Sequence, residues 1–286
     1  MPELPEVESI KRGLERKIIG QKILNIKILN EKIVYSNSNM RITDKNKTNE
    51  FINGVLNKII ISIERKAKNI IITFDDSSLV IIHLKMTGQL IYSISDIEIE
   101  KKTKIEFKLD HGTMVYNDVR GFGYVLYYTD MRSALTHGHF HNMGIEPFDK
   151  RFDTQYLYSK LQDKKYNNKN LKSVLLDQSL VVGIGNIYAD EICFASNILP
   201  SRICSTLSIQ EIDTLYQNII NILEKSISLG GSSVSDYRLS DGHKGTYAKY
   251  HKVYRRGGLA CYVCETDIDK IVIAGRSTHY CPLCQK

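Results

Sequence analysis

The hexapeptide Met1-Pro2-Glu3-Leu4-Pro5-Glu6 begins the chain and predicts a helix with an unusual start. Its carboxylates would lie at the positive end of the helix dipole, where negative charge is stabilising. Apolar residues then recur at helical spacing up to a glycine suited to end the helix: Val7, Ile10, Leu14, Ile18 and Gly20. We therefore expect the amino terminus to be tied to a buried scaffold by this helix.

Removal of Met1, which a small second residue permits, would leave Pro2 with a free secondary amine beside Glu3. An unperturbed α-amino group has a pKa near 7.7–8.0, so roughly 10–15 % is unprotonated at pH 7, against a few lysines in ten thousand. Such an amine can attack a sugar C1′ carbon and pass through an imine, with Glu3 as the proton-transfer group. The alternative is that these prolines and glutamates only begin a helix.

The composition is that of a soluble globular protein with room for two domains. The chain has 286 residues, of which 42 % are hydrophobic and 25 % charged. The net charge is +7, and residues 244–286 hold eight Lys or Arg against three Asp or Glu, a surplus of five. This basic segment favours an acidic partner. No apolar run approaches about 18 residues and the start lacks a secretory pattern, so we expect no membrane span.

Residues 22–128 predict a β-rich domain. Short β-branched and aromatic runs occupy residues 59–63, 69–74, 79–84, 104–109 and 114–116. Asp110-His111-Gly112 between the last two is a hairpin signal. Many short strands with few helices between them favour an antiparallel sandwich or barrel. We assign this domain to residues 1–133 and an interdomain linker, without clear periodicity, to residues 134–152.

Helices dominate the next segment, residues 153–251. Three short ones are expected at residues 154–161, 171–177 and 187–196. A capping box, Ser208-Ile209-Gln210-Glu211, opens the longest helix, and Gly230-Gly231 ends it. The following residues, 232–251, are rich in Ser, Gly, Tyr and Lys and are expected to form a mobile loop.

Four cysteines near the C-terminus predict a zinc site. Cys261-x2-Cys264 is followed, after sixteen residues, by Cys281-x2-Cys284, the spacing of two zinc knuckles joined by a hairpin. Two disulfides are the alternative, but no secretory signal supports an oxidising compartment. We expect one structural Zn²⁺ within a finger at residues 252–286. Basic residues around the finger favour contact with a nucleic-acid backbone.

A glycine-containing turn forms a second constellation, Gly183-Ile184-Gly185-Asn186-Ile187-Tyr188. Backbone amides freed at Gly183 and Gly185, beside a helix N-terminus, would suit a phosphate. Asn186 could instead be a simple N-cap of the next helix. The sequence leaves these two interpretations open. Cys193 and Cys204 are expected to be buried free thiols.

Three motifs in this order resemble the bacterial formamidopyrimidine-DNA glycosylases, part of the formamidopyrimidine/endonuclease VIII family of base-excision repair. They are Pro2-Glu3-Leu4-Pro5-Glu6-Val7-Glu8, the turn at residues 183–188 and the four-cysteine finger, and the resemblance spans the chain. It implies an α+β fold: an N-terminal β-sandwich with a leading helix, then a helix-two-turn-helix domain ending in a zinc-binding β-hairpin. DNA is held between the two domains in that family.

The resemblance also implies an activity. Members are bifunctional glycosylase/AP lyases that excise 8-oxoguanine and formamidopyrimidines through a Schiff base, then cleave the strand by β,δ-elimination. We accordingly expect a monomeric cytoplasmic enzyme of bacterial type that acts on damaged double-stranded DNA.

Residue by residue, the resemblance assigns Pro2 as the nucleophile, Glu3 as the acid/base group and Lys68 as the lysine that assists strand cleavage. It assigns a joint role to the trio Met86, Arg120 and Phe122, which fill the gap that a flipped base leaves in the duplex. It assigns backbone contacts to Lys102, Lys172, Asn186 and Arg276, and lesion capping to residues 232–250. Without it, Met86 and Phe122 would be taken as core residues and Lys68 as a solvated lysine.

Departures from the family pattern concern DNA affinity more than chemistry. Many members carry a histidine where Lys102 stands, a lysine cluster where Tyr166-Asn167-Asn168 stands, and Arg or Lys in place of Gly121. Gly121 is expected to loosen its loop. Two alternatives remain: an endonuclease VIII-like enzyme for oxidised pyrimidines, and a DNA-binding zinc module without catalysis. The Met86, Arg120 and Phe122 trio favours the purine branch, and intact Pro2, Glu3 and Lys68 favour an enzyme.

Overall fold

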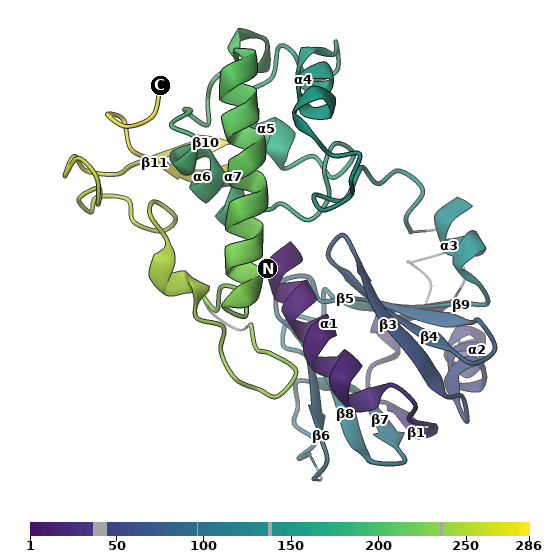
Figure 1. Cartoon of the computed structure of the whole chain (residues 1–286). Coiled ribbons are helices and arrows are strands. Elements are labelled where there is room, and N and C mark those ends of the chain that lie inside the picture. The colour runs from purple at the N-terminus through teal and green to yellow at the C-terminus, as the bar shows by residue number, and fades with distance from the viewer. Residues whose placement is uncertain (37–44, 96, 137–138, 235–236) are drawn as a thin grey trace. The chain divides into compact units, whose positions relative to one another are not determined.

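The computed structural model describes residues 1–36, 45–95, 97–136, 139–234 and 237–286. The chain divides into two compact units (Figure 1). Residues 1–142 and 229–246 form the N-terminal unit, and residues 143–228 and 247–286 form the C-terminal unit. The chain thus returns to the N-terminal unit after its longest helix.

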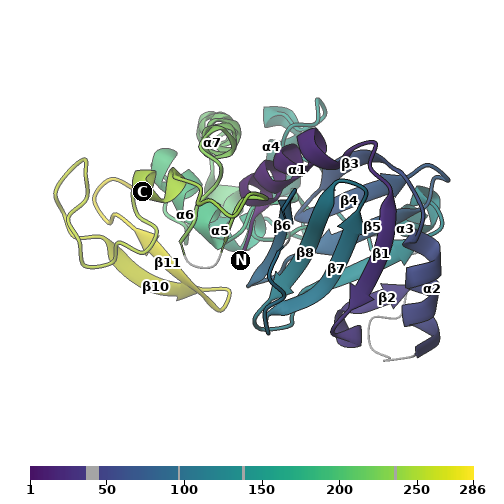
Figure 2. The same cartoon turned by 90° about the horizontal axis from the view of Figure 1, so that it is seen from below.

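Two sheets form the N-terminal unit and lie as layers in Figure 2. The first has the strand order β1-β7-β8-β6 and is antiparallel throughout. The second has the order β2-β9-β5-β4-β3, in which the β2–β9 pair is parallel and the other three described pairs are antiparallel. Their bounds are Ile23–Ile28 (β1), Val34–Ser36 (β2), Ile60–Lys66 (β3), Asn69–Phe74 (β4), Leu79–His83 (β5), Gly88–Ser93 (β6), Thr103–Leu109 (β7), Gly112–Asp118 (β8) and Tyr124–Tyr128 (β9).

The core of this unit lies between the sheets. Buried residues alternate with partly exposed ones along β7, as the sequence pattern predicts for a strand with one face in a core. Phe107 and Tyr116 from the first sheet join one apolar cluster with Ile72 and Ile82 from the second. The predicted antiparallel sandwich is therefore confirmed, and the 110–112 turn joins β7 to β8.

The leading helix α1 (Leu4–Ile18) has the predicted extent. Its apolar stripe is fully buried and packs against β3 and β4. Gly20, two residues beyond the helix, has φ +84°, a conformation that favours glycine after a helix. The amino terminus is thus anchored to the second sheet.

Helix α2 (Lys45–Val55) was not predicted from the sequence. Its polar first half carries no helical apolar stripe in the sequence, and Phe51 and Val55 are fully buried, one turn apart. Contacts with β1 and β2 stabilise it. A short helix, α3 (Met131–Thr136), follows β9. Both helices depend on tertiary packing, which outweighs weak local propensity.

The C-terminal unit is helical. Its helices are α4 (Thr154–Gln162), α5 (Leu171–Leu175), α6 (Asn186–Ala195) and α7 (Ile209–Ser228). The predicted capping box opens α7, because the Ser208 backbone N–H donates to Glu211 Oε2 at 2.8 Å and Glu211 N–H donates to Ser208 Oγ at 3.2 Å. Among the described residues, 3₁₀ turns occur at Glu31–Ile33, Cys204–Thr206 and Tyr247–Tyr250.

An antiparallel hairpin, β10 (Asp269–Ile273) and β11 (Arg276–Tyr280), lies between the two cysteine pairs. Strand β11 packs against α6. Among the described residues, none of the helices combines the length and apolar character needed to cross a bilayer.

The loop after α7 belongs to a different unit from the one the sequence suggested. Residues 229–246 pack with the N-terminal unit, whereas the sequence grouped them with residues 153–251. Within them, Tyr237 and Ser240 are buried. Residues 235–236 of the expected capping loop, and residues 137–138 of the expected linker, lie outside the described residues.

Candidate functional site

The head of α1 is held by hydrogen bonds around buried residues. Pro2 and Glu3 are buried behind the exposed Met1. A capping box satisfies the first turn, in which the Glu3 N–H donates to Glu6 Oε2 at 2.8 Å. The proline expected at the start of the helix occupies its first turn. Glu3 is therefore fixed at the head of α1, and Pro2 directly precedes it.

The loop after α7 is tied to the same helix end through Glu6. Ser232 N–H donates to Glu6 Oε1 at 2.7 Å, while the Tyr237 hydroxyl donates to the Glu6 carbonyl at 3.1 Å. Gly231 has φ +78°, and a Cβ there would lie 2.9 Å from Glu6 Oε1. A glycine is thus required where the loop meets α1. One Glu6 carboxylate contacts both the helix start and the loop.

Lys68 lies in the two-residue turn between β3 and β4 and is only 6 % exposed. The turn is connected to α1 by an ion pair between Arg65 Nε and Glu8 Oε2 at 3.0 Å. Arg65 also donates to the carbonyl of Ala67, at 3.0 Å. Ala67 has φ +54°, so the hydrogen bond holds a conformation that side chains rarely adopt. The structure thus joins the helix of Pro2 and Glu3 to the turn of Lys68.

A polar network borders this turn. Asn69 donates to the Lys66 carbonyl at 3.1 Å, and its Oδ1 lies 2.9 Å from His139 Nε2. Burial, with the charge of Lys85, lowers the pKa of His139 to about 4. Burial also lowers the pKa of His83 well below its usual range, with smaller contributions from nearby cations including Lys68. Both imidazoles are consequently neutral at pH 7.

The three predicted wedge residues lie on two loops of the N-terminal unit. Met86 lies between β5 and β6, and Arg120 and Phe122 lie between β8 and β9. Met86 is 39 % exposed and Phe122 is 55 % exposed, so neither is a core residue. The guanidinium of Arg120 lies 4.7 Å from the Phe122 ring centre. An apolar pair with an adjacent cation is therefore available at the surface.

Gly121 adopts a backbone conformation in this loop that favours glycine. Its φ is +64°, a left-handed conformation, and no other atom lies near the position of its Cβ. Glycine adopts this conformation without the strain that Arg or Lys would incur. The backbone turn between Arg120 and Phe122 thus favours the residue that is present.

In the C-terminal unit, Asn186 and Arg276 lie on adjoining elements. Gly185 is the N-cap of α6 and Asn186 is its first residue, so the N-cap interpretation of Asn186 is wrong. Asn186 Nδ2 donates to the Ser277 carbonyl at 3.0 Å, next to the exposed Arg276. The Gly183 amide is not free for an anion, because it donates to Gln178 Oε1 at 2.9 Å.

Lys172 does not lie on the surface where a phosphate could reach it. Its side chain is fully buried and its ammonium lies 2.6 Å from Asp190 Oδ1. It also donates to Thr278 Oγ1 at 2.8 Å and to the Ser277 carbonyl at 3.1 Å. The other Asp190 oxygen accepts from His279 N–H at 3.0 Å. The structure thus contradicts the prediction that Lys172 contacts phosphate directly. Lys172 instead holds β11 against α6.

The structure also describes Lys102 and Tyr166, two positions where the sequence departs from the family pattern. Lys102 is one-third exposed and pairs with Glu100 at 2.9 Å. Tyr166 is buried, and its hydroxyl lies 3.2 Å from Asp177 Oδ2. Lys165 and Lys169 lie over the ring of Tyr166, at 4.8 and 5.5 Å from its centre. Tyr166 therefore supports flanking lysines and is not itself exposed to a partner.

The sulfur atoms of the four C-terminal cysteines face one another, all within 4.8 Å. Cys261 Sγ and Cys284 Sγ are 3.9 Å apart, and Cys264 Sγ and Cys281 Sγ are 3.4 Å apart. Tetrahedral zinc with Zn–S bonds of about 2.3 Å places sulfurs about 3.8 Å apart, whereas a disulfide requires about 2.05 Å. The cluster thus fits one structural zinc. Cys193 and Cys204 are buried and free, as expected.

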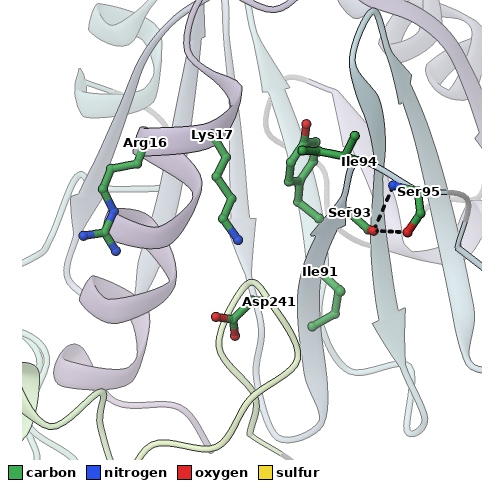
Figure 3. Close-up of a pocket in the computed structure, with 8 residues that line it drawn as sticks. Arg16, Lys17, Ile91, Ser93, Ile94, Ser95 and Asp241 are labelled. Carbon is green, nitrogen blue, oxygen red and sulfur yellow. Dashed lines mark hydrogen bonds between the residues drawn. The ribbon is translucent and has the colours of Figure 1, made fainter.

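A groove of about 770 Å³ lies at the other end of α1 (Figure 3). Arg16 and Lys17 of α1 line it together with residues of β6 and Asp241, and the Lys17 side chain extends toward Asp241. Asp241 belongs to the segment predicted to cap the lesion, residues 232–250, whereas the predicted catalytic, wedge and metal residues do not line this groove.

Comparisons with known proteins agree with this arrangement. Three family models match: "Formamidopyrimidine-DNA glycosylase N-terminal domain" over residues 1–125, "Formamidopyrimidine-DNA glycosylase H2TH domain" over residues 143–238, and "Zinc finger found in FPG and IleRS" over residues 258–286. A formamidopyrimidine-DNA glycosylase of Carboxydothermus hydrogenoformans is 37 % identical over 286 residues, covering 100 % of both chains. This chain belongs to the formamidopyrimidine-DNA glycosylase family.

Other members of the formamidopyrimidine-DNA glycosylase family are similarly related. The Bacillus anthracis protein is 36 % identical, over 100 % of this chain and 99 % of that protein. Among solved structures, Lactococcus lactis Fpg in complex with abasic-site DNA has a TM-score of 0.88 and 34 % identity, over 99 % of each chain. The same values, over 100 % of each chain, hold for wild-type L. lactis Fpg with DNA containing N7-benzyl-Fapy-dG. The family and the α+β fold predicted from the sequence are confirmed.

Sequence reasoning missed the residues that hold the site together. Glu8, Arg65 and Asn69 make these connections. Glu8 lies within the N-terminal motif, but nothing in that motif identifies Arg65 as its partner. The packing of α1 against β3 and the contact between Asn69 and His139 reveal these partners.

Proposed function

We propose that this protein is a bifunctional DNA glycosylase and AP lyase that removes oxidised purines from duplex DNA in base-excision repair. Its relatives are named formamidopyrimidine-DNA glycosylases, and similar solved structures contain DNA with an abasic site or a Fapy-dG lesion. The single observation that carries the proposal is the ion pair between Arg65 and Glu8 at 3.0 Å. It connects α1, the helix that directly follows Pro2-Glu3, to the turn of Lys68.

The proposed reaction starts from the free Pro2 nitrogen after Met1 is removed. The nitrogen attacks C1′ of the damaged nucleotide, the glycosidic bond breaks, and the base leaves with a proton. The Pro2 nitrogen loses its proton and the sugar ring opens as the C1′–O4′ bond breaks and O4′ takes up a proton, which leaves Pro2 and C1′ joined as an iminium ion. Loss of a C2′ proton breaks the 3′ C–O bond, and a second elimination breaks the 5′ C–O bond. Glu3 transfers protons at the sugar, and Lys68 assists strand cleavage.

The wedge residues reduce the cost of exposing the lesion. Extruding a base costs a few kcal/mol in lost stacking and pairing. Met86 and Phe122 would occupy the gap in the duplex, and Arg120 would face the orphan base. Their exposure at the tips of two loops supports this role.

Asn186, Arg276 and Lys102 are proposed to contact the DNA backbone. Zn²⁺ bound by the four cysteines stabilises the hairpin that carries Arg276 and takes no part in the chemistry. A single chain supplies all these residues, so we propose a monomeric enzyme. Because its proposed substrate is chromosomal DNA, we infer that it acts in the cytoplasm, at the nucleoid.

The test is borohydride trapping on a duplex with 8-oxoguanine opposite cytosine. Protein with a free Pro2 should excise the base and become covalently trapped, because borohydride reduces the iminium. Protein that retains one residue before Pro2 should do neither, since an amide nitrogen is not nucleophilic. Its DNA affinity should change little, because Asn186 and Arg276 are unaltered.

Excision by the blocked protein at the rate of the free protein would exclude Pro2 as the nucleophile. No trapping of either form, with DNA binding intact, would favour a non-catalytic zinc module. A parallel duplex with an oxidised pyrimidine tests the endonuclease VIII-like alternative, which predicts faster excision of that base.

A further inference from the structure

We propose that Asp118 and Thr87 are positioning residues that lock the two wedge loops to each other. The Met86 loop is residues 84–87 and the Arg120 loop is residues 119–123. This inference rests on the proposed function, because it assigns a purpose to the separation between Met86 and the Arg120–Phe122 pair. Neither Asp118 nor Thr87 is expected to touch DNA.

Strand pairing brings the two loops together. Strands β6 and β8 are antiparallel, and Gly88, the first residue of β6, pairs with Asp118, the last residue of β8. The Met86 loop therefore ends where the Arg120 loop begins. The loops are more than thirty residues apart in the sequence, since Thr87 and Asp118 differ by 31 positions.

The Asp118 carboxylate accepts hydrogen bonds from both loops. Oδ1 accepts from the Thr87 hydroxyl at 2.5 Å and from the Arg120 backbone N–H at 3.2 Å. Oδ2 accepts from the Gly123 N–H at 2.8 Å. The Arg120 N–H also lies 3.1 Å from the Thr87 hydroxyl oxygen. These contacts connect the residue after Met86 to both ends of the segment that contains Arg120 and Phe122.

Asp118 is fully buried although it carries a carboxylate. A buried carboxylate is costly unless donors satisfy its oxygens. The donors here all belong to the two loops, so loss of the loop arrangement would leave the carboxylate unsatisfied. We call the hydrogen bonds that Asp118 accepts from Thr87, Arg120 and Gly123 the clip. Because they form together on one carboxylate, they are cooperative and oppose independent movement of the two loops.

Tyr116 supports the loops from beneath, two residues before Asp118 on the same face of β8. It is fully buried. A Cβ on Gly123 would lie 1.7 Å from the Tyr116 hydroxyl oxygen, and a Cβ on Gly88 would lie 2.8 Å from it. Both loops can approach Tyr116 only because glycine stands at these positions. The clip and this support together determine where Met86 and Phe122 project.

The arrangement predicts a specific effect on opening the duplex. The three wedge residues must enter the base stack together. If the clip already fixes the separation of their two loops, less conformational entropy is lost when the base leaves the duplex. An abasic nucleotide has no base to unstack and should depend less on the wedge. Loosening the clip should therefore slow excision of a base more than cleavage at a preformed abasic site.

The experiment compares Thr87→Val with Thr87→Ser in the full chain. Valine matches threonine in shape but cannot donate to Asp118, whereas serine retains the hydroxyl. Single-turnover excision of 8-oxoguanine opposite cytosine should fall roughly three- to tenfold in Thr87→Val, the effect of one lost hydrogen bond, and stay within about twofold in Thr87→Ser. Borohydride trapping on a preformed abasic-site duplex should stay within about twofold in both variants.

A second measurement reports base opening directly. The fluorescence of 2-aminopurine beside the lesion should rise more slowly with Thr87→Val and with Asp118→Asn, whose amide presents a donor to the loop amides. Asp110→Asn, on the exposed turn between β7 and β8, is the matched control and should behave as the unaltered protein.

Equal losses of excision and abasic-site trapping in Thr87→Val, or unchanged excision, would overturn the clip. Absence of both activities in the unaltered protein would instead contradict the proposed function. The two failures are therefore distinguishable.

Discussion

At the scale of single residues, burial separates the wedge residues from Lys172. Met86 and Phe122 are apolar and would be assigned to a core by type alone, yet both are substantially exposed. Lys172 is a cation that would be assigned to the surface, yet it is fully buried. Each departs from the preference of its residue type. The wedge residues therefore suit contact with a partner, and Lys172 suits an internal role.

Lys172→Met should destabilise the C-terminal unit by about 3–5 kcal/mol, because it removes the cation from a buried pair with Asp190. Adding Asp190→Leu should restore part of this loss, since no buried carboxylate then lacks its partner. Urea unfolding followed by circular dichroism measures both variants. Unchanged stability of Lys172→Met, with weakened DNA binding, would instead favour direct contact with phosphate.

At the scale of elements, the C-terminal hairpin depends on two connections. The four sulfurs join its two ends, where the Val263 and Cys284 backbone N–H groups each donate to a cysteine sulfur at 3.4 Å. The Lys172–Asp190 pair joins β11 to α6. A two-stranded hairpin is marginally stable by itself in water. We therefore expect the metal to supply most of its stability.

Removal of zinc by a chelator should unfold the hairpin and weaken DNA binding, because Arg276 loses its fixed position. Cys264→Ser should lower the zinc content well below one per chain. Cys204→Ser, which alters a buried cysteine outside the cluster, should retain one zinc per chain. Metal analysis combined with a DNA-binding assay checks this. Intact DNA binding by zinc-free protein would contradict the role given to the hairpin.

At the scale of the whole molecule, the excess positive charge is distributed unevenly between the two units. The net charge of +7 includes a surplus of five in residues 244–286. Most of that segment belongs to the C-terminal unit, whereas residues 229–246 belong to the N-terminal unit. The proposed chemistry thus lies in the N-terminal unit, while much of the excess positive charge lies in the other.

The salt dependence of DNA binding should report this distribution. Each phosphate contact adds about 0.9 to the slope of log K against log salt concentration. Arg276→Ala should therefore reduce the slope by about 1. Lys27→Ala, which removes the same charge from an exposed position on β1, should leave it unchanged. Equal effects of the two variants would show that Arg276 contributes only through net charge.

The sequence by itself determined those features that arise from local spacing. The period of apolar residues predicted α1, strict alternation predicted β7, and the capping box predicted the start of α7. The pairs Cys261/Cys264 and Cys281/Cys284 predicted the zinc cluster. Each of these signals lies within one element or one short motif, so it can be detected without knowing which segments meet. The free amine expected at Pro2, with Glu3 beside it, was also read from the sequence, whereas the family resemblance added Lys68 and the wedge residues.

Only the tertiary structure decided which residues connect these parts. The partners Glu8 and Arg65 are 57 residues apart, and Thr87 and Asp118 are 31 apart. The burial of Lys172 depends on residues more than one hundred positions later in the chain. The physical reason is that strand register and helix packing select these partners, and an isolated polar residue carries no record of them in its local spacing.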